Sequence, residues 1–122
     1  MTNWPKEIPI PQEIGKGSYF RNGEPCCAVG HLHSLNLWSN NGYACSMPNK
    51  KIGAKFEVLY GKLCRILFPE IKYSFIVNIN DNLSDENRRL LYLLTWAKLG
   101  YTEGMPQNVL KLLKNPKVAA IK

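Results

Sequence analysis

The amino-acid sequence predicts an α-rich α+β fold in a single small domain, with three to four helices packed on a short strand or hairpin. The chain has 122 residues, which is enough for one hydrophobic core. Apolar residues recur at helical spacing in several segments, and the tight-turn dipeptide Asn22-Gly23 can close a hairpin. Apolar residues make up 45% of the sequence and charged residues 20%, so the composition excludes a wholly disordered chain.

Residues 1–24 are predicted to form an extended N-terminal arm. Pro5, Pro9 and Pro11 cannot occupy a helix interior, so at most an edge strand is expected here. The turn at residues 15–18 contains two glycines and a lysine, but it lacks the spacing of a phosphate-binding fingerprint. The arm therefore carries no recognisable phosphate-binding motif.

A first helix is predicted to begin at Pro25 and to end before the turn at residues 40–42. Proline suits the first helical position, and Ala28, Leu32 and Leu35 recur at the spacing of one buried stripe. Gly30 within this helix costs about 1 kcal/mol relative to alanine. We therefore expect Gly30 to allow the close approach of another element.

A loop over residues 43–53 and a second helix over 54–68 are predicted next. The helix has one apolar face, and Pro69 ends it. Residues 71–79 carry apolar side chains at every odd position, which favours a strand, although part of the pattern also fits a helical face.

The next predicted element is a helix capped by Ser84. Its first turn carries Asp85 and Glu86, as the helix dipole prefers, and Gly100 provides its C-terminal stop. A short helix is predicted over 107–114, and residues 115–122 are expected to form a basic C-terminal tail.

The excess positive charge lies in the later part of the chain. The formal net charge is +7; residues 1–49 hold three Lys/Arg against three Asp/Glu, whereas residues 50–122 hold thirteen against six. Such a field raises encounter rates with anions, although it can also serve only as a solvated surface. The cations expected to form a binding surface are Lys50, Lys51, Lys55, Lys62, Arg65, Arg88 and Arg89.

These features predict a small basic binding protein with an anionic partner, which would be a nucleic acid, a nucleotide or an acidic protein face. Tyr60, Tyr92 and Trp96 flank the cations, and aromatic rings among cations suit single-stranded nucleic acid. Tyr60 and Trp96 also fall close to apolar helix faces, where core packing is the simpler explanation. No nucleic-acid-binding signature is present, so attraction to phosphate would be non-specific and salt-dependent.

A second hypothesis is a cysteine-dependent hydrolase or transferase. Residues 25–35 hold both histidines and two of the four cysteines. If the helix begins at Pro25, its first turn lowers the pKa of a thiol there, and His31 lies one turn beyond Cys27. A Cys27 nucleophile, a His31 base and an orienting Asp81 or Asn80 would form a catalytic set. The alternative interpretation of these cysteines is a buried core wall.

A third hypothesis is a zinc-stabilised module. Thiol and imidazole side chains can supply a tetrahedral site, but no C-x-x-C pair occurs in the sequence. The weak candidate ligands are Cys26, His33, Cys45 and Cys64. No cofactor is expected.

The sequence also predicts where the protein acts. No apolar run is long enough to span a bilayer, and the first twenty residues contain no secretory hydrophobic segment. A cytoplasmic protein with reduced thiols and no membrane contact is therefore expected.

The pattern Cys27-Ala28-Val29-Gly30-His31-Leu32, followed by Ile79-Asn80-Asp81 and a helix ending in alanine, resembles a loose group of small phage and bacterial proteins. Those proteins carry an early C-x-x-G-x-L and a later N-D pair. The resemblance spans residues 26–97 and implies a phage or bacterial origin and an α-rich fold, with Cys27, Gly30 and Asp81 as shared positions. It implies no activity. A phage origin would make inhibition of a host factor a natural use, by analogy alone.

Overall fold

The computed structural model confirms the predicted α-rich α+β fold in one small domain. It describes residues 8–35 and 50–121, without the side chains of Lys50 and Lys51. Two strands and six helices lie within these residues. The elements are β1 (Phe20–Arg21), β2 (Glu24–Pro25), α1 (Ala28–Ser34), α2 (Lys50–Leu67), α3 (Ile76–Asp81), α4 (Asp85–Lys98), α5 (Gln107–Leu113) and α6 (Pro116–Ala119).

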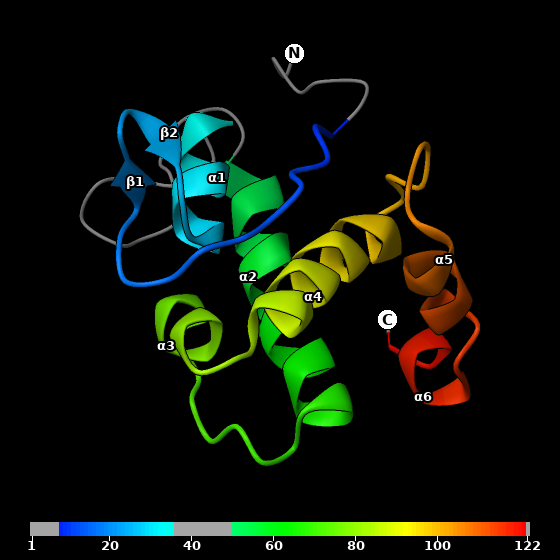
Figure 1. Ribbon diagram of the computed structural model, residues 1–122. Coiled ribbons are helices and arrows are strands. Elements are labelled where there is room, and N and C mark those ends of the chain that lie inside the picture. The colour runs from blue at the N-terminus through cyan, green and yellow to red at the C-terminus, as the bar shows by residue number, and fades with distance from the viewer. Residues whose placement is uncertain (1–7, 36–49, 122) are drawn as a thin grey trace.

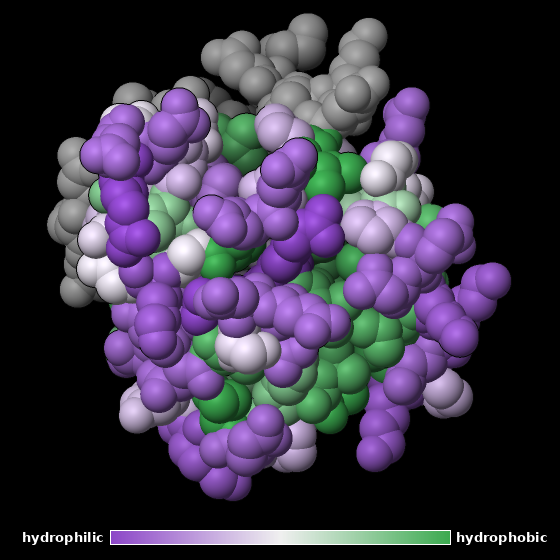
Figure 2. Space-filling view, in the orientation of Figure 1, coloured by the Kyte–Doolittle hydropathy of each residue, from purple (hydrophilic) through white to green (hydrophobic). Residues whose placement is uncertain are grey.

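Helices α2 and α4 cross at the centre of the molecule (Figure 1). The hairpin, α1 and α3 lie on one side of this crossing, and α5 and α6 lie on the other. Polar side chains cover much of the face drawn in Figure 2, and they surround an apolar area between α4 and the corner formed by α5 and α6. No helix of the described residues combines the length and apolar character needed to cross a membrane.

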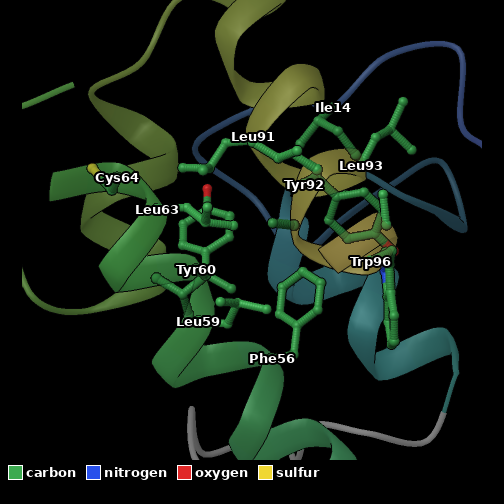
Figure 3. Packing of buried hydrophobic residues seen from close by; sticks show 14 of the residues in the cluster. Ile14, Phe56, Leu59, Tyr60, Leu63, Cys64, Leu91, Tyr92, Leu93 and Trp96 are labelled. Atoms are coloured by element: carbon green, nitrogen blue, oxygen red, sulfur yellow. The ribbon is translucent and has the colours of Figure 1, made fainter. Parts of the chain in front are cut away.

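The core is built on an aromatic cluster that joins α2 to α4 (Figure 3). The ring of Phe56 lies 4.8 Å from that of Trp96, 5.6 Å from that of Tyr92 and 5.9 Å from that of Tyr60, measured between centroids. All four side chains are buried. Aromatic pairs at these separations add to the stabilisation that burial of their area provides. Tyr60, Tyr92 and Trp96, the aromatic residues considered for base stacking from the sequence, are therefore part of the core.

The hairpin forms at the predicted turn. Asn22 and Gly23 both have positive φ, 55° and 79°, as a two-residue hairpin turn of the primed type requires. The turn pairs Arg21 with Glu24 and Phe20 with Pro25. Pro25 therefore belongs to β2, and the prediction that it opens the first helix is wrong. Helix α1 begins three residues later, with Cys27 as its N-cap.

Three other segments differ from the predictions. Helix α2 begins at Lys50, within the predicted loop. Residues 71–79 do not form the favoured strand: α3 begins at Ile76, and Ile76 and Ile79 are buried on one helical face. Within the expected basic tail, Asn115 accepts a hydrogen bond from the amide of Lys117 and caps the short helix α6.

The helix predicted after Ser84 is confirmed in detail. Ser84 Oγ accepts a hydrogen bond from the amide of Asn87 at 3.2 Å. At the other end, Gly100 has φ of +109°, and the amides of Gly100 and Tyr101 donate to the carbonyls of Ala97 and Trp96. This is the Schellman pattern, in which a residue with positive φ closes the helix.

Candidate functional site

The predicted nucleophile Cys27 lies at the start of α1, buried against the core. Burial raises the pKa of its thiol, and the nearby charges of Asp81 and Cys26 raise it further. Hydrogen bonds from the amides of Gly30 and Val29 act in the opposite direction, but burial is the largest cause. A buried thiol with a raised pKa remains protonated near neutral pH, which is the opposite of an activated nucleophile.

His31 and Asp81 do not complete a catalytic set with Cys27. The ring of His31 lies 5.7 Å from that of Tyr92, between centroids. Burial lowers the pKa of His31, while a hydrogen bond to the Cys26 backbone raises it to a smaller extent. Asp81 Oδ1 instead accepts from the amide of Gly17 and from Asn80 Nδ2, each at 3.2 Å. No hydrogen bond between any two of these three side chains is found in the described residues.

Asn80, the alternative to Asp81 as an orienting group, ties three segments together. Its Oδ1 accepts from the amide of Ala28 at 3.2 Å, and its Nδ2 donates to the carbonyl of Gly15 at 2.9 Å. Its side chain is fully buried. The Asn-Asp pair therefore fastens the N-terminal arm and the first turn of α1 to α3.

Gly30 has the role that the sequence predicts, a close approach between elements. A Cβ atom at this position would lie 1.8 Å from the carbonyl oxygen of Tyr19, in the segment that leads into β1. The same oxygen accepts a hydrogen bond from the amide of Cys26 at 2.8 Å. The arm therefore contacts α1 through backbone, and only glycine leaves room for it.

Arg88 and Arg89 are predicted to belong to the basic binding surface; the structure buries Arg88, which corrects the prediction for that residue, whereas Arg89 is half-buried. Arg88 is 3% exposed, and its Nε donates to the carbonyl of Ile14 at 2.8 Å. Its other nitrogens bond to the carbonyl of Leu83 and to the carboxylate of Asp85. Arg89 Nε donates to the carbonyl of Pro11 at 2.8 Å. Both guanidinium groups hold the arm against α4 through these bonds to its carbonyls.

The weak zinc candidates are not gathered into a site. Cys26 and Cys64 are buried free thiols, and His33 packs edge-on against Phe20 at 5.4 Å between ring centroids. Cys45 lies outside the described residues. Within the described ranges, no group of three or more metal-ligating side chains occurs.

The remaining predicted cations lie on α2. Lys55, Lys62 and Arg65 are exposed on this helix, while Lys50 and Lys51 form its first two residues and their side chains lie outside the described part. Beside these cations lies a groove of about 580 Å³, here named the lysine-rimmed groove. It is lined by Ala54, Lys55, Val58, Leu59, Lys62, Lys98, Leu99 and Ile121.

The lysine-rimmed groove combines an aliphatic floor with uncompensated positive charge. Val58 is 56% exposed, which is high for a large apolar side chain. Lys98 Nζ donates to the carbonyl of Ala119 at 3.4 Å, a neutral acceptor that leaves its charge in place. No carboxylate is among the described residues that line the groove.

A second hollow differs in charge. It has a volume of about 470 Å³ and lies between the arm and the start of α4. Its charged lining consists of three acidic and three basic residues, which balance. They are Glu13, Lys16, Arg21, Asp81, Asp85 and Arg88. An anion therefore gains no net Coulomb attraction there, unlike at the lysine-rimmed groove.

The sequence predicts the lysines on the α2 side of the lysine-rimmed groove but not the residues on its opposite side. The spacing of Lys55 and Lys62 places them on the polar face of a helix. Lys98, Leu99 and Ile121 come from the end of α4 and from beyond α6, so only the fold brings them opposite α2. No signal in the sequence pairs these positions.

Compared with known family models, curated proteins and solved structures, the chain matches none. The resemblance to small phage and bacterial proteins thus stays a prediction.

Proposed function

We propose that this protein is a small, non-catalytic binding protein that engages an anionic partner through the exposed face of α2. One observation carries the proposal: Lys55, Lys62 and Lys98 border a groove whose described lining contains no carboxylate. Ammonium groups held in water at a groove rim attract anions over roughly a Debye length, about 8 Å at physiological salt.

The arrangement of the cations supports this choice of face. Arg88 is buried and bonded to a carboxylate as well as to two carbonyls, so its charge is already matched. Arg89 is half-buried, and its Nε is bonded to the carbonyl of Pro11 in the arm. Lys55, Lys62 and Arg65 have exposed side chains and share one side of α2. The proposed surface is therefore smaller than the sequence predicts and consists mainly of lysines.

The buried aromatic residues weigh against a base-stacking surface. Tyr60, Tyr92 and Trp96 are at most 1% exposed, so they are not available to stack on bases. At the lysine-rimmed groove, whose described lining holds no aromatic side chain, single-stranded nucleic acid would bind only through its phosphates, without the stacking that contributes much of its affinity elsewhere. An acidic protein face does not need such stacking.

A binding measurement with anionic probes tests the proposal. We would titrate the full chain with fluorescent poly-glutamate and follow anisotropy while salt is raised from about 0.05 to about 0.5 M. The double variant K55E/K62E is compared with K16E/K72E, which makes the same change of net charge at two exposed lysines outside the groove. We expect K55E/K62E alone to lose binding. Binding that is unchanged by salt, or lost equally in both variants, would overturn the proposal.

A further inference from the structure

We infer that the occupant of the lysine-rimmed groove is an acidic amphipathic helix of a partner protein. This inference rests on the proposed function and names the partner class for the same site. It is carried by two features of the groove together, namely its aliphatic floor and the helical repeat of the cations on its rim.

The floor of the groove selects for apolar side chains. Ala54, Val58, Leu59, Leu99 and Ile121 supply it, and none of the described lining residues is aromatic. A purely ionic partner would leave Val58 and its neighbours facing water, whereas aliphatic side chains inserted among them would remove that apolar surface from water. The occupant therefore needs apolar groups as well as negative charge.

The rim of the groove repeats with the pitch of a helix. Lys55 and Lys62 are separated by two turns of α2, about 10 Å along its axis. Val58 lies between them on the same side of the helix. A partner helix packed along α2 presents its own side chains with this repeat, so carboxylates two turns apart face both lysines while apolar residues between them cover Val58.

The opposite bank completes the match. Lys98 ends α4, Leu99 caps it, and Ile121 follows α6, so the groove has a charged and an aliphatic component on each side. The volume of about 580 Å³ is of the size that buries a few side chains rather than a whole domain face. An acidic helix bound here packs its apolar stripe against the aliphatic floor and places its carboxylates beside the lysines on both sides of the groove.

A pair of model peptides tests the inference. The first is an alanine- and glutamine-based helical peptide with two glutamates placed two turns apart and leucines between them on the same face. The second has the same composition and charge, but its leucines lie on the face opposite the glutamates. We expect the first to bind about tenfold more tightly than the second, measured by fluorescence anisotropy with the full chain.

Variants of the groove separate its two components. K55E/K62E is expected to lower the affinity for the first peptide about tenfold or more. K16E/K72E is expected to change that affinity by less than about twofold. Val58→Ser is expected to lower the affinity for the first peptide several-fold. It should leave the thermal unfolding midpoint of the protein unchanged, since Val58 is 56% exposed. The matched control is Phe75→Ser, which removes another exposed apolar side chain outside the groove and should have no effect on binding.

The outcomes distinguish this inference from the proposed function. Equal binding of the two peptides, with no effect of Val58→Ser, would overturn the amphipathic helix and leave anion binding standing. Tighter binding of a single-stranded oligonucleotide, or of laurate, with the same dependence on Lys55 and Lys62 would assign the groove to nucleic acid or to a fatty acid instead. If neither peptide nor poly-glutamate binds, both proposals fall.

Discussion

The arm junction and the lysine-rimmed groove use the same kind of charge in opposite ways. The arm junction, formed by Ile14, Gly15, Asn80 and Arg88, turns a guanidinium group inward onto carbonyls of the chain. The lysine-rimmed groove turns ammonium groups outward beside an apolar floor with no described carboxylate. Positive charge stabilises the fold where buried carbonyls and a carboxylate surround it, and it is available to a partner where the described lining holds no carboxylate.

The chemistry of the two cations fits this division. A guanidinium group carries five donors in a planar fork, so Arg88 bonds to Ile14, Leu83 and Asp85 at once. A lysine ammonium group is a strongly hydrated point charge on a flexible stem, which suits an exposed rim. Substitutions in the arm junction should therefore change stability, and substitutions in the groove should change binding.

The largest effect is expected from Gly30→Ala in α1. The added Cβ would overlap the Tyr19 carbonyl oxygen, which is backbone and cannot rotate away. We expect the free energy of unfolding to fall by about 3 kcal/mol, the upper end for overpacking, as measured by urea denaturation. Gly61→Ala in α2 is the control, because its Cβ meets only the end of Arg65 at 3.9 Å. That variant should gain about 1 kcal/mol from helix propensity. Equal effects of the two substitutions would show that the arm does not constrain α1.

Arg88→Met should follow, with a loss of about 3 kcal/mol. Methionine fills much of the same space but leaves the buried carbonyls of Ile14 and Leu83 without their charged donor. Arg89→Met removes one bond, to the carbonyl of Pro11, and should cost about 1 kcal/mol. Urea denaturation of both variants measures the difference. A similar small loss in both would place Arg88 among ordinary surface cations and remove the contrast with the groove.

Asn80→Ala should cost about 2 kcal/mol. The substitution leaves the amide of Ala28 and the carbonyl of Gly15 without partners in a buried environment. Asn82→Ala is the matched control, since the side chain of Asn82, the C-cap of α3, is exposed and its one hydrogen bond found in the described residues goes to the carbonyl of Asn78. Its unfolding free energy should change by less than about 0.5 kcal/mol. Amide hydrogen exchange at Ala28 would report the local loss, and unaltered protection there would contradict the role given to Asn80.

The features predictable from the sequence are those with a local cause. Asn22-Gly23, Ser84 and Gly100 each act within a few residues, and each forms the turn, cap or stop that the sequence predicts. Pro25 was misassigned because helix and hairpin compete for it, and the two-residue turn decides in favour of β2 by pairing Pro25 with Phe20. Local pattern alone could not rank these two signals.

The features missed by sequence reasoning depend on long-range contacts. In residues 71–79 the alternation of apolar residues predicts a strand, yet α3 forms because Ile76 and Ile79 are buried together and Asn80 bonds to the arm. The sequence predicts Arg88 and Arg89 as surface cations, because their bonds to the carbonyls of the arm depend on how the chain folds. The residues opposite α2 in the lysine-rimmed groove likewise cannot be predicted until the positions of α4 and α6 are known.

His31 provides a smaller effect, one that depends on pH. Its ring faces Tyr92 and borders a hollow of about 250 Å³ that Glu24 also lines. Burial lowers the pKa of His31 below its ordinary 6.5, so the unfolded chain binds a proton at a higher pH than the folded chain does. The contribution of His31 to stability is thus present above pH 6.5 and is lost as the pH falls below it. Urea denaturation between about pH 7.5 and pH 5 should show a smaller decline for His31→Gln than for the wild type. Parallel declines would contradict a neutral, buried His31.

The smallest change in stability is expected from K55E/K62E. Both lysines are exposed on α2, and no ion pair involving either occurs among the described residues. Exposed substitutions of this kind alter the unfolding free energy by about 0.5 kcal/mol or less, although the same variant is expected to abolish poly-glutamate binding. Reversing the two charges also lowers the repulsion within a chain of net charge +7, so a slight gain in stability is consistent with this expectation. Urea denaturation beside the binding titration makes the test complete. A loss of more than about 2 kcal/mol would mean that these lysines, like Arg88, serve the fold, and any loss of binding would then have a structural cause.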